Sequence, residues 1–403
     1  MKTMKTMKTM KLILTGAAAI SLASFAQAET YTFTASADYS GPFADVMPDS
    51  MSGLKAIVDY WNTEVGEGLG VDVDLKIYDM RYDSAQIART WPSILSSDSP
   101  IIHLGWGSPD LVTLMGRLPN DKVPMLLGTA MGGQGWTENG WHFSTRPTYS
   151  HEFSGLFSYL AAGNDGPLKI AAISTQTRAG FVDQVEGVKQ LATQYPDTYT
   201  MTSTQWADTA PVSLTPQVRA ALADEPDVIL VAGTTAQVIA TAKAMEELGT
   251  NVPIVMSTHN GLAEVSKGLS LDRIEGSYST FSFAAPGKEN LPIRDVFETY
   301  APNGNWGTIA EQSAAQAILA LRVLEQAVAE VGADNVTGQA MYDALIAHTY
   351  SEESLLGALP TLNYDTTAPF PVGEIKSSAE IVKDGKIVPV QDDWFAVPVL
   401  DKW

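Results

Sequence analysis

Apolar and polar residues recur along the chain with two different periodicities. Stretches with an apolar residue at every second position, or with a short continuous apolar run, predict buried strands. In the first third of the chain these strands are expected at residues 31–37, 71–78, 101–104 and 123–127. Between them, apolar residues recur every three or four positions, which predicts helices at residues 51–64 and 84–95. Repeated strand–helix–strand units predict an α/β fold whose parallel sheet has helices on both faces.

A second series with the same rhythm begins near residue 149. Its clearest unit runs from residue 227 to residue 257: an apolar strand, a Gly-Thr-Thr turn, an amphipathic helix that stops at Gly249, and another strand. Further strands are expected at 168–174 and 253–256, further helices at 180–195 and within 305–331, and a hairpin around the turn at 383–386. The mature chain has no repeat or linker between the two series, so we expect the chain to cross between two lobes several times.

The first 28 residues have the features of a secretory signal peptide. Four lysines precede an uncharged apolar run at residues 12–26, and Ala26-Gln27-Ala28 supplies the small-x-small pattern for cleavage. The alternative, a retained N-terminal membrane anchor, needs a longer span than this run of about 15 residues provides. We therefore expect export to the periplasm, a mature chain that starts at Glu29, and no direct membrane insertion.

Composition narrows the classes of partner. About 375 residues remain after cleavage, more than one comfortable hydrophobic core, which favours two domains. The formal net charge of −21 repels nucleic acid and anionic headgroups, so neither is expected as a partner. The chain has no cysteine, which rules out disulfides and a lipid-modified cysteine anchor. No histidine or carboxylate cluster has the spacing of metal ligands, so no metal or cofactor is expected.

Candidate ligand-binding residues follow the predicted strands, because ligands bind at the carboxyl ends of strands in open α/β sheets. The loops after these strands are rich in glycine and hydroxyl side chains, which suits a carboxylate or another small anion. One such loop alone is most simply an ordinary helix cap, but several at equivalent strand ends favour a shared cleft. These loops are 38–43, 105–110, 128–133, 175–178, 233–235 and 258–261.

Several large or basic side chains in these regions have two interpretations. Trp106, between two glycines, is either a wall of the pocket or part of the packing between lobes. Trp136 and Trp141, in a glycine-rich loop, either cap an apolar ligand group or pack the loop down. Arg146 and Arg178 either pair with a ligand carboxylate or form structural salt bridges.

Catalytic motifs are not found in the sequence. Ser108 lacks a Gly-x-Ser-x-Gly elbow, and the chain has no His-Glu-x-x-His motif, phosphate loop or dinucleotide fingerprint. A secreted hydrolase of amides or esters is the alternative to a binding protein, and it would require His103 or His259 beside Ser108 as a base. A sensory ligand-binding protein of the same fold is a third possibility, although the sequence contains no signalling segment.

The order of these short motifs resembles the type I periplasmic binding proteins of ABC importers, in the branched-chain amino acid, amide and urea group. The resemblance covers essentially all of the mature chain. It rests on the following segments: Tyr39-Ser40-Gly41-Pro42 after the first strand, Tyr78-Asp79 with Asp83 nearby, Gly105-Trp106-Gly107-Ser108, and Arg146-Pro147-Thr148-Tyr149-Ser150.

The resemblance implies two doubly wound parallel-sheet lobes joined by a three-segment hinge that closes on the ligand. Lobe 1 is expected at residues 29–147 and 282–358, and lobe 2 at residues 148–281 and 359–403. It also implies a non-enzymatic protein, expected to be monomeric, that passes a small-molecule ligand to permease subunits in the membrane. The expected ligand-binding residues are Tyr39, Trp106, Gly107, Ser108, Thr129, Ala130, Tyr149, Arg178, Thr234, His259 and Asn260.

The sequence departs from the family at the site for an amino group. In such proteins, loops matching Gly107-Ser108 and Thr129-Ala130 hold the ligand carboxylate, while a tyrosine and an acid in the second lobe receive an α-amino group. Here the position of the acid falls in 258–260, which has no Asp or Glu, and no tyrosine lies near Arg178. The expected ligand is a small amphipathic carboxylate, either a branched-chain or hydrophobic amino acid or an aromatic acid.

Overall fold

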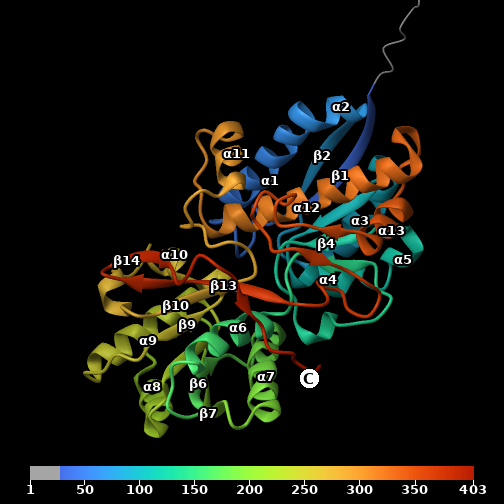
Figure 1. Cartoon of the computed structure of the whole chain (residues 1–403). Coiled ribbons are helices and arrows are strands. Elements are labelled where there is room, and N and C mark those ends of the chain that lie inside the picture. Colours follow the sequence, from blue (N-terminus) through green and yellow to red (C-terminus); the bar gives the residue numbers. More distant parts are fainter. Residues whose placement is uncertain (1–27) are drawn as a thin grey trace, which may run out of the picture.

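The computed structural model describes residues 28–403, and the signal peptide expected at 1–28 lies outside this range except for Ala28. Figure 1 shows two α/β lobes, one above the other. No helix in residues 28–403 combines the length and the apolar character needed to cross a membrane.

The first sheet is parallel and has the strand order β2-β1-β3-β4-β5. Its elements in chain order are β1 (Glu29–Ala37), α1 (Met47–Trp61), α2 (Glu67–Leu69), β2 (Val71–Asp79), α3 (Ser84–Asp98), β3 (Ile102–Gly105), α4 (Ser108–Leu114), α5 (Leu118–Asp121), β4 (Met125–Leu127) and β5 (His142–Ser144). Each strand predicted in this part of the chain is present, and β5 is a strand that the short apolar pattern did not reveal.

The second sheet has the order β14-β13-β10-β9-β8-β6-β7 and is parallel except at β13 and β14. Its elements are α6 (Tyr149–Ala161), β6 (Leu168–Ser174), α7 (Ala179–Gln194), β7 (Tyr199–Trp206), α8 (Thr215–Ala221), β8 (Val228–Ala232), α9 (Thr235–Glu247), β9 (Ile254–Met256), α10 (Leu262–Val265), β10 (Tyr278–Phe281), β13 (Lys376–Lys383), β14 (Lys386–Pro389) and β15 (Phe395–Ala396). The hairpin expected at 379–390 is present as the antiparallel pair β13–β14.

The second sheet separates two hydrophobic cores, because successive side chains of a strand point to opposite faces. Ile229 and Val231 of β8 face the core beneath α8 and α9. Val228, Leu230 and Ala232 of the same strand face the core beneath α6 and α7. This burial on both faces explains why the strand is a continuous apolar run.

Between β10 and β13 the chain returns to the first lobe. There it forms α11 (Pro292–Tyr300), α12 (Thr308–Val331), α13 (Gly338–Ala347), and a short pair β11 (Thr349–Tyr350) and β12 (Leu362–Asn363). α12 is buried over most of its length and packs along α1. Within residues 28–403 the chain therefore passes between the two sheets in three places: after β5, after β10 and before β13. The residue bounds expected for each lobe stay a prediction.

Candidate functional site

An aromatic cluster lies at the carboxyl ends of the first-lobe strands. The indole of Trp106, only 7% exposed, contacts the rings of Phe43 and Tyr82 at centroid distances of 4.9 and 5.9 Å. Its Nε1 donates a hydrogen bond to Ser50 Oγ at 3.1 Å. Trp106 therefore packs within its own lobe, while the partly buried rings of Phe43 and Tyr82 extend the apolar surface outward.

A buried carboxylate fixes the loop that carries Trp106. Asp110 Oδ2 accepts hydrogen bonds from the backbone N–H groups of Trp106 and Gly107, both at 3.0 Å, and its Oδ1 accepts one from Ser36 Oγ at 2.6 Å. Burial raises the pKa of Asp110, but the neighbouring His103 imidazole, Ser36 and the Gly107 N–H outweigh burial and hold this pKa below its ordinary value. The carboxylate therefore stays charged and holds the loop in one conformation.

Tyr82 is a further candidate site residue, absent from those expected from the sequence. It follows Arg81 in a pair of left-handed residues, with φ of +59° and +49°, an uncommon backbone for residues other than glycine. Its ring lies directly beneath Gly107, where a Cβ would be 2.5 Å from Tyr82 Cε2. Its position in the loop after β2 could have identified it from the sequence, because Tyr39 was selected for the same position after β1.

Tyr82 and Ser108 approach the second lobe at the start of α7. Burial raises the pKa of the Tyr82 hydroxyl, while a hydrogen bond with Ser108 and the charge of Arg178 lower it. Ser108 Oγ lies 4.0 Å from the point that a Cβ on Gly180 would occupy. A hydroxyl pair of the first lobe and a guanidinium of the second thus share one neighbourhood, and both Ser108 and Arg178 are exposed.

A second aromatic group lies on the second-lobe side. His259 stacks on Phe181 at 5.5 Å and 20°, and meets Tyr149 edge-on at 5.7 Å. Its ring nitrogens lie 3.0 Å from Ser257 Oγ and 3.2 Å from the Gly233 carbonyl. Burial lowers the pKa of His259 to about 4, so the imidazole is neutral at pH 7.

The histidines required by the hydrolase alternative have other partners. His103 is buried between Thr34 and Ser36, at 3.0 and 3.1 Å from their hydroxyls. His259 is held by Ser257 and Gly233, as described above. Within the part of the chain that the structure describes, neither imidazole forms a hydrogen bond with Ser108.

The other expected residues have mixed surroundings. Thr129 is half-buried and its carbonyl accepts from Ser144 Oγ at 2.7 Å, while Ala130 is buried. Tyr39 is 45% exposed. Two side chains are engaged locally: Thr234 caps α9 by accepting from the Gln237 N–H at 3.2 Å, and Asn260 bonds the backbones of Ser257 and Val231.

Arg146 forms a structural salt bridge, one of the two interpretations given by the sequence. It is fully buried, and its Nε and a terminal nitrogen donate to the two carboxylate oxygens of Glu152, both at 2.7 Å. The other terminal nitrogen donates to Gln312 Oε1 at 2.8 Å, and Thr258 Oγ1 is a further acceptor. Arg146 therefore links the passage after β5 to helices of both lobes.

Trp136 and Trp141 both pack their loop against distant segments. Trp141 stacks on Tyr342 at 4.4 Å and 14°. Trp136 meets Phe370 at 4.8 Å and Trp403 at 6.2 Å. The packing interpretation of these two residues is therefore the one seen in the structure.

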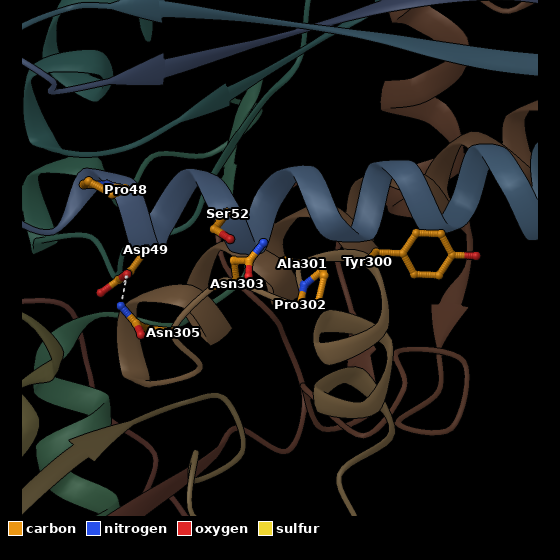
Figure 2. Close-up of a pocket in the computed structure, with 9 residues that line it drawn as sticks. Pro48, Asp49, Ser52, Tyr300, Ala301, Pro302, Asn303 and Asn305 are labelled. Atoms are coloured by element: carbon orange, nitrogen blue, oxygen red, sulfur yellow. Dashed lines mark hydrogen bonds between the residues drawn. The ribbon is translucent and has the colours of Figure 1, made fainter.

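A cavity lies away from these loops, on the surface of the first lobe. It measures about 460 Å³ and lies between the start of α1 and the segment that joins α11 to α12. Figure 2 shows its lining, in which Asn305 donates to Asp49 at 3.2 Å. None of its lining residues belongs to the loops at the strand ends. Among residues 28–403, no three histidine or carboxylate side chains are grouped so as to hold a metal ion.

Comparisons with known proteins agree on the architecture. A family model described as "Periplasmic binding protein" matches residues 30–378. A substrate-binding protein of an ABC transporter from Aeropyrum pernix is 18% identical, with a TM-score of 0.76 over 92% of this chain and 96% of that chain. No curated protein sequence gives a significant match.

Two further solved structures differ in the ligand that they name. A branched-chain amino acid ABC transporter protein from Thermus thermophilus with bound valine is 16% identical, with a TM-score of 0.74 over 91% of this chain and 96% of that chain. A fatty acid ABC transporter substrate-binding protein from Thermomonospora curvata is also 16% identical, with a TM-score of 0.74 over 91% and 92%. At these identities the likeness shows the fold.

Proposed function

The chain belongs to the periplasmic binding protein family, and from this premise we propose that it captures a small amphipathic carboxylate for an ABC importer. The ligand binds between the lobes and carries an apolar or aromatic body. Hinge closure then presents the liganded protein to the permease subunits in the membrane. The protein acts in the periplasm as a non-enzymatic carrier, consistent with the signal peptide expected from the sequence.

One observation carries the ligand class: an aromatic surface adjoins a cationic and hydroxyl-bearing end. Phe43 and Tyr82 supply the apolar surface beside Trp106. Ser108 forms a hydrogen bond with Tyr82, and the charge of Arg178 acts on the same Tyr82 hydroxyl. A guanidinium with neighbouring hydroxyls suits a carboxylate, and the aromatic rings suit an apolar body.

The residues on the second-lobe side favour a ligand that does not need an ammonium group for binding. The segment 258–260, where the resemblance places an acid, contains none, and its His259 is neutral at pH 7. Both carboxylate oxygens of the nearby Glu152 already accept hydrogen bonds from the Arg146 guanidinium. An ammonium group would therefore lose its hydration without gaining an ion pair, which is unfavourable. Apolar or aromatic acids are therefore favoured over amino acids as ligands.

A thermal-shift screen with matched compounds tests the proposal. Leucine, 4-methylpentanoate and isoamylamine share one apolar body and differ in their charged groups; phenylalanine, phenylacetate and phenethylamine form an aromatic set. We expect 4-methylpentanoate and phenylacetate to raise the melting temperature more than leucine and phenylalanine do. We expect the two amines to leave it unchanged. A ligand at a hundred times its Kd stabilises the folded state by about 2.7 kcal/mol. Stabilisation by the amines alone, or turnover of an ester or amide, would contradict the proposal.

A further inference from the structure

A first-lobe loop is held by a second-lobe carboxylate. The backbone N–H of Gly133, in the loop after β4, donates to both oxygens of Asp183 on α7 at 2.9 Å. The same carboxylate accepts a hydrogen bond from Trp403 Nε1 at 3.0 Å. Asp183 thus joins a loop of the first lobe, a helix of the second lobe and the C-terminal segment.

Glycines make this close approach possible. A Cβ on Gly132 would lie 2.8 Å from Asp183 Oδ2, and a Cβ on Gly133 would lie 3.0 Å from Trp403 Nε1. On α7, a Cβ on Gly187 would lie 2.8 Å from the Trp403 ring. Side chains at these three positions would push the loop, the carboxylate and the indole apart. The contact between the lobes therefore explains the glycines at 132 and 133, while Gly187 also makes room for Ser150 Oγ of α6.

The C-terminal segment 399–403 is anchored on the second lobe and reaches the first. The Val399 carbonyl accepts from Gln194 Nε2 at 3.1 Å and from the Tyr195 hydroxyl at 2.8 Å, and Leu400 is buried in the core beneath α7. Lys402 Nζ then donates to the Trp136 carbonyl at 2.6 Å. In Figure 1 this end of the chain lies beside α7, next to the loops below α4.

We infer that Asp183 and Trp403 form a latch between the lobes that favours the closed arrangement. The contacts lie one helical turn from Gly180, where α7 meets Ser108 across the candidate site. Opening the lobes separates Gly133 from Asp183 and Trp136 from Trp403, while the bond between Trp403 and Asp183 stays within the second lobe. An interaction made in the closed form alone adds to the affinity of any ligand that binds this form. The two residues therefore act as positioning residues, and this effect on affinity rests on the proposed function.

The first test measures the distance between the lobes without ligand. The chain has no cysteine, so spin labels can be placed at Ser96→Cys on α3 and Ala220→Cys on α8, both exposed positions. In Asp183→Ala and Trp403→Ala the distance distribution should shift to longer values than in the parent. Glu186→Ala, an exposed position on the same helix, should match the parent. If an alanine variant does not fold, the same measurement is made on Asp183→Asn, which preserves volume, or on Trp403→Phe, which preserves ring packing.

The second test uses 4-methylpentanoate and phenylacetate in calorimetry. The latch variants should bind about tenfold more weakly, mostly through faster dissociation, because a hydrogen bond to a charged group is lost. If the parent binds neither acid, the proposed ligand class fails, while the distance measurement still tests the latch. Unchanged distance distributions in all folded latch variants would overturn the latch itself.

Discussion

Arg146 and Glu152 form a fully buried, two-pronged ion pair at the passage between the lobes. Both nitrogen–oxygen distances are 2.7 Å, and neither side chain is exposed to solvent. The Arg146 guanidinium also lies 5.1 Å from the centroid of the Phe283 ring, which belongs to the passage after β10. Two of the passages between the lobes therefore meet at one cation.

Breaking this pair should be strongly destabilising. Glu152→Gln leaves the Arg146 charge buried without its partner, and such changes cost about 3–5 kcal/mol of unfolding free energy. Urea denaturation of the ligand-free protein measures this loss. The exposed pair of Arg294 and Glu298 provides the control, since Glu298→Gln should change stability little. A variant at position 152 as stable as this control would contradict the structural role of the pair.

Gly107→Ala should disturb both folding and binding. The added methyl group would lie 2.5 Å from Tyr82 Cε2, so the ring or the loop must move. Overpacking of this kind costs about 1–3 kcal/mol, and the displaced Tyr82 should weaken ligand binding. Gly68→Ala is the matched control, because nothing lies within 4 Å of its added Cβ. Equal melting temperatures and affinities for the two variants would contradict this packing.

Stability should fall as pH rises from about 4.5 to about 7. Burial raises the pKa of Glu380 from 4.5 to about 7, partly offset by the Gly287 N–H. Between these values the folded state keeps the proton that the unfolded chain releases, so stability is fully present below pH 4.5 and declines up to about pH 7. The full effect is at most about 3 kcal/mol.

Glu380→Gln should therefore flatten this decline and stabilise the protein at pH 8 relative to the parent. Glu311, whose pKa burial also raises, should retain part of the slope. Urea midpoints between pH 5 and pH 8 give the comparison. A parent-like pH dependence in the variant would assign the slope to other groups.

Removing the proposed carboxylate partners should weaken binding of acids selectively. Ser108→Ala, Thr129→Ala and Arg178→Ala each remove a proposed contact, and the loss of one hydrogen bond to a charged group corresponds to roughly 10- to 150-fold in affinity. Arg219→Ala, an exposed arginine on α8, is the control for lost charge. Parent-like affinity in Ser108→Ala and Thr129→Ala would remove those two residues from the site.

Trp106→Ala tests the apolar wall. The indole is only 7% exposed, so its removal should act through the rings of Phe43 and Tyr82 that it supports, and an aromatic pair of this kind contributes about 1 kcal/mol. Calorimetry should show this loss with phenylacetate, provided that circular dichroism shows a folded variant. Unchanged affinity would leave Trp106 with the packing role that its contacts with Phe43 and Ser50 already give it.

Local patterns predicted the strands well because each strand is buried in its own lobe. All five residues of β8 are buried because helices cover both faces of its sheet, and this burial is visible in the sequence as a continuous apolar run. Trp141 and Trp136 had two interpretations because their partners, Tyr342 and Trp403, are more than 200 residues away. Periodicity carries no information about such contacts.

The candidate site was predicted less completely for the same reason. Tyr82 reaches the candidate site through two successive left-handed residues and through the space that Gly107 leaves by lacking a Cβ, and both depend on tertiary packing. Arg146 could not be assigned from its type alone, since its partners on α6 and α12 are brought together only by folding. Ser108 and Arg178 could be proposed from the sequence because position at a strand end is a local property.

The outer strands of the two sheets bear on how this protein behaves at high concentration. β2 lies at an edge of the first sheet and carries Asp72, Asp74 and Lys76 at alternate positions. β14 lies at an edge of the second sheet, begins with Lys386 and ends with Pro389. Charges and proline on an edge disfavour pairing with a strand of another molecule. These two edges are therefore protected against strand pairing between molecules when the protein is concentrated.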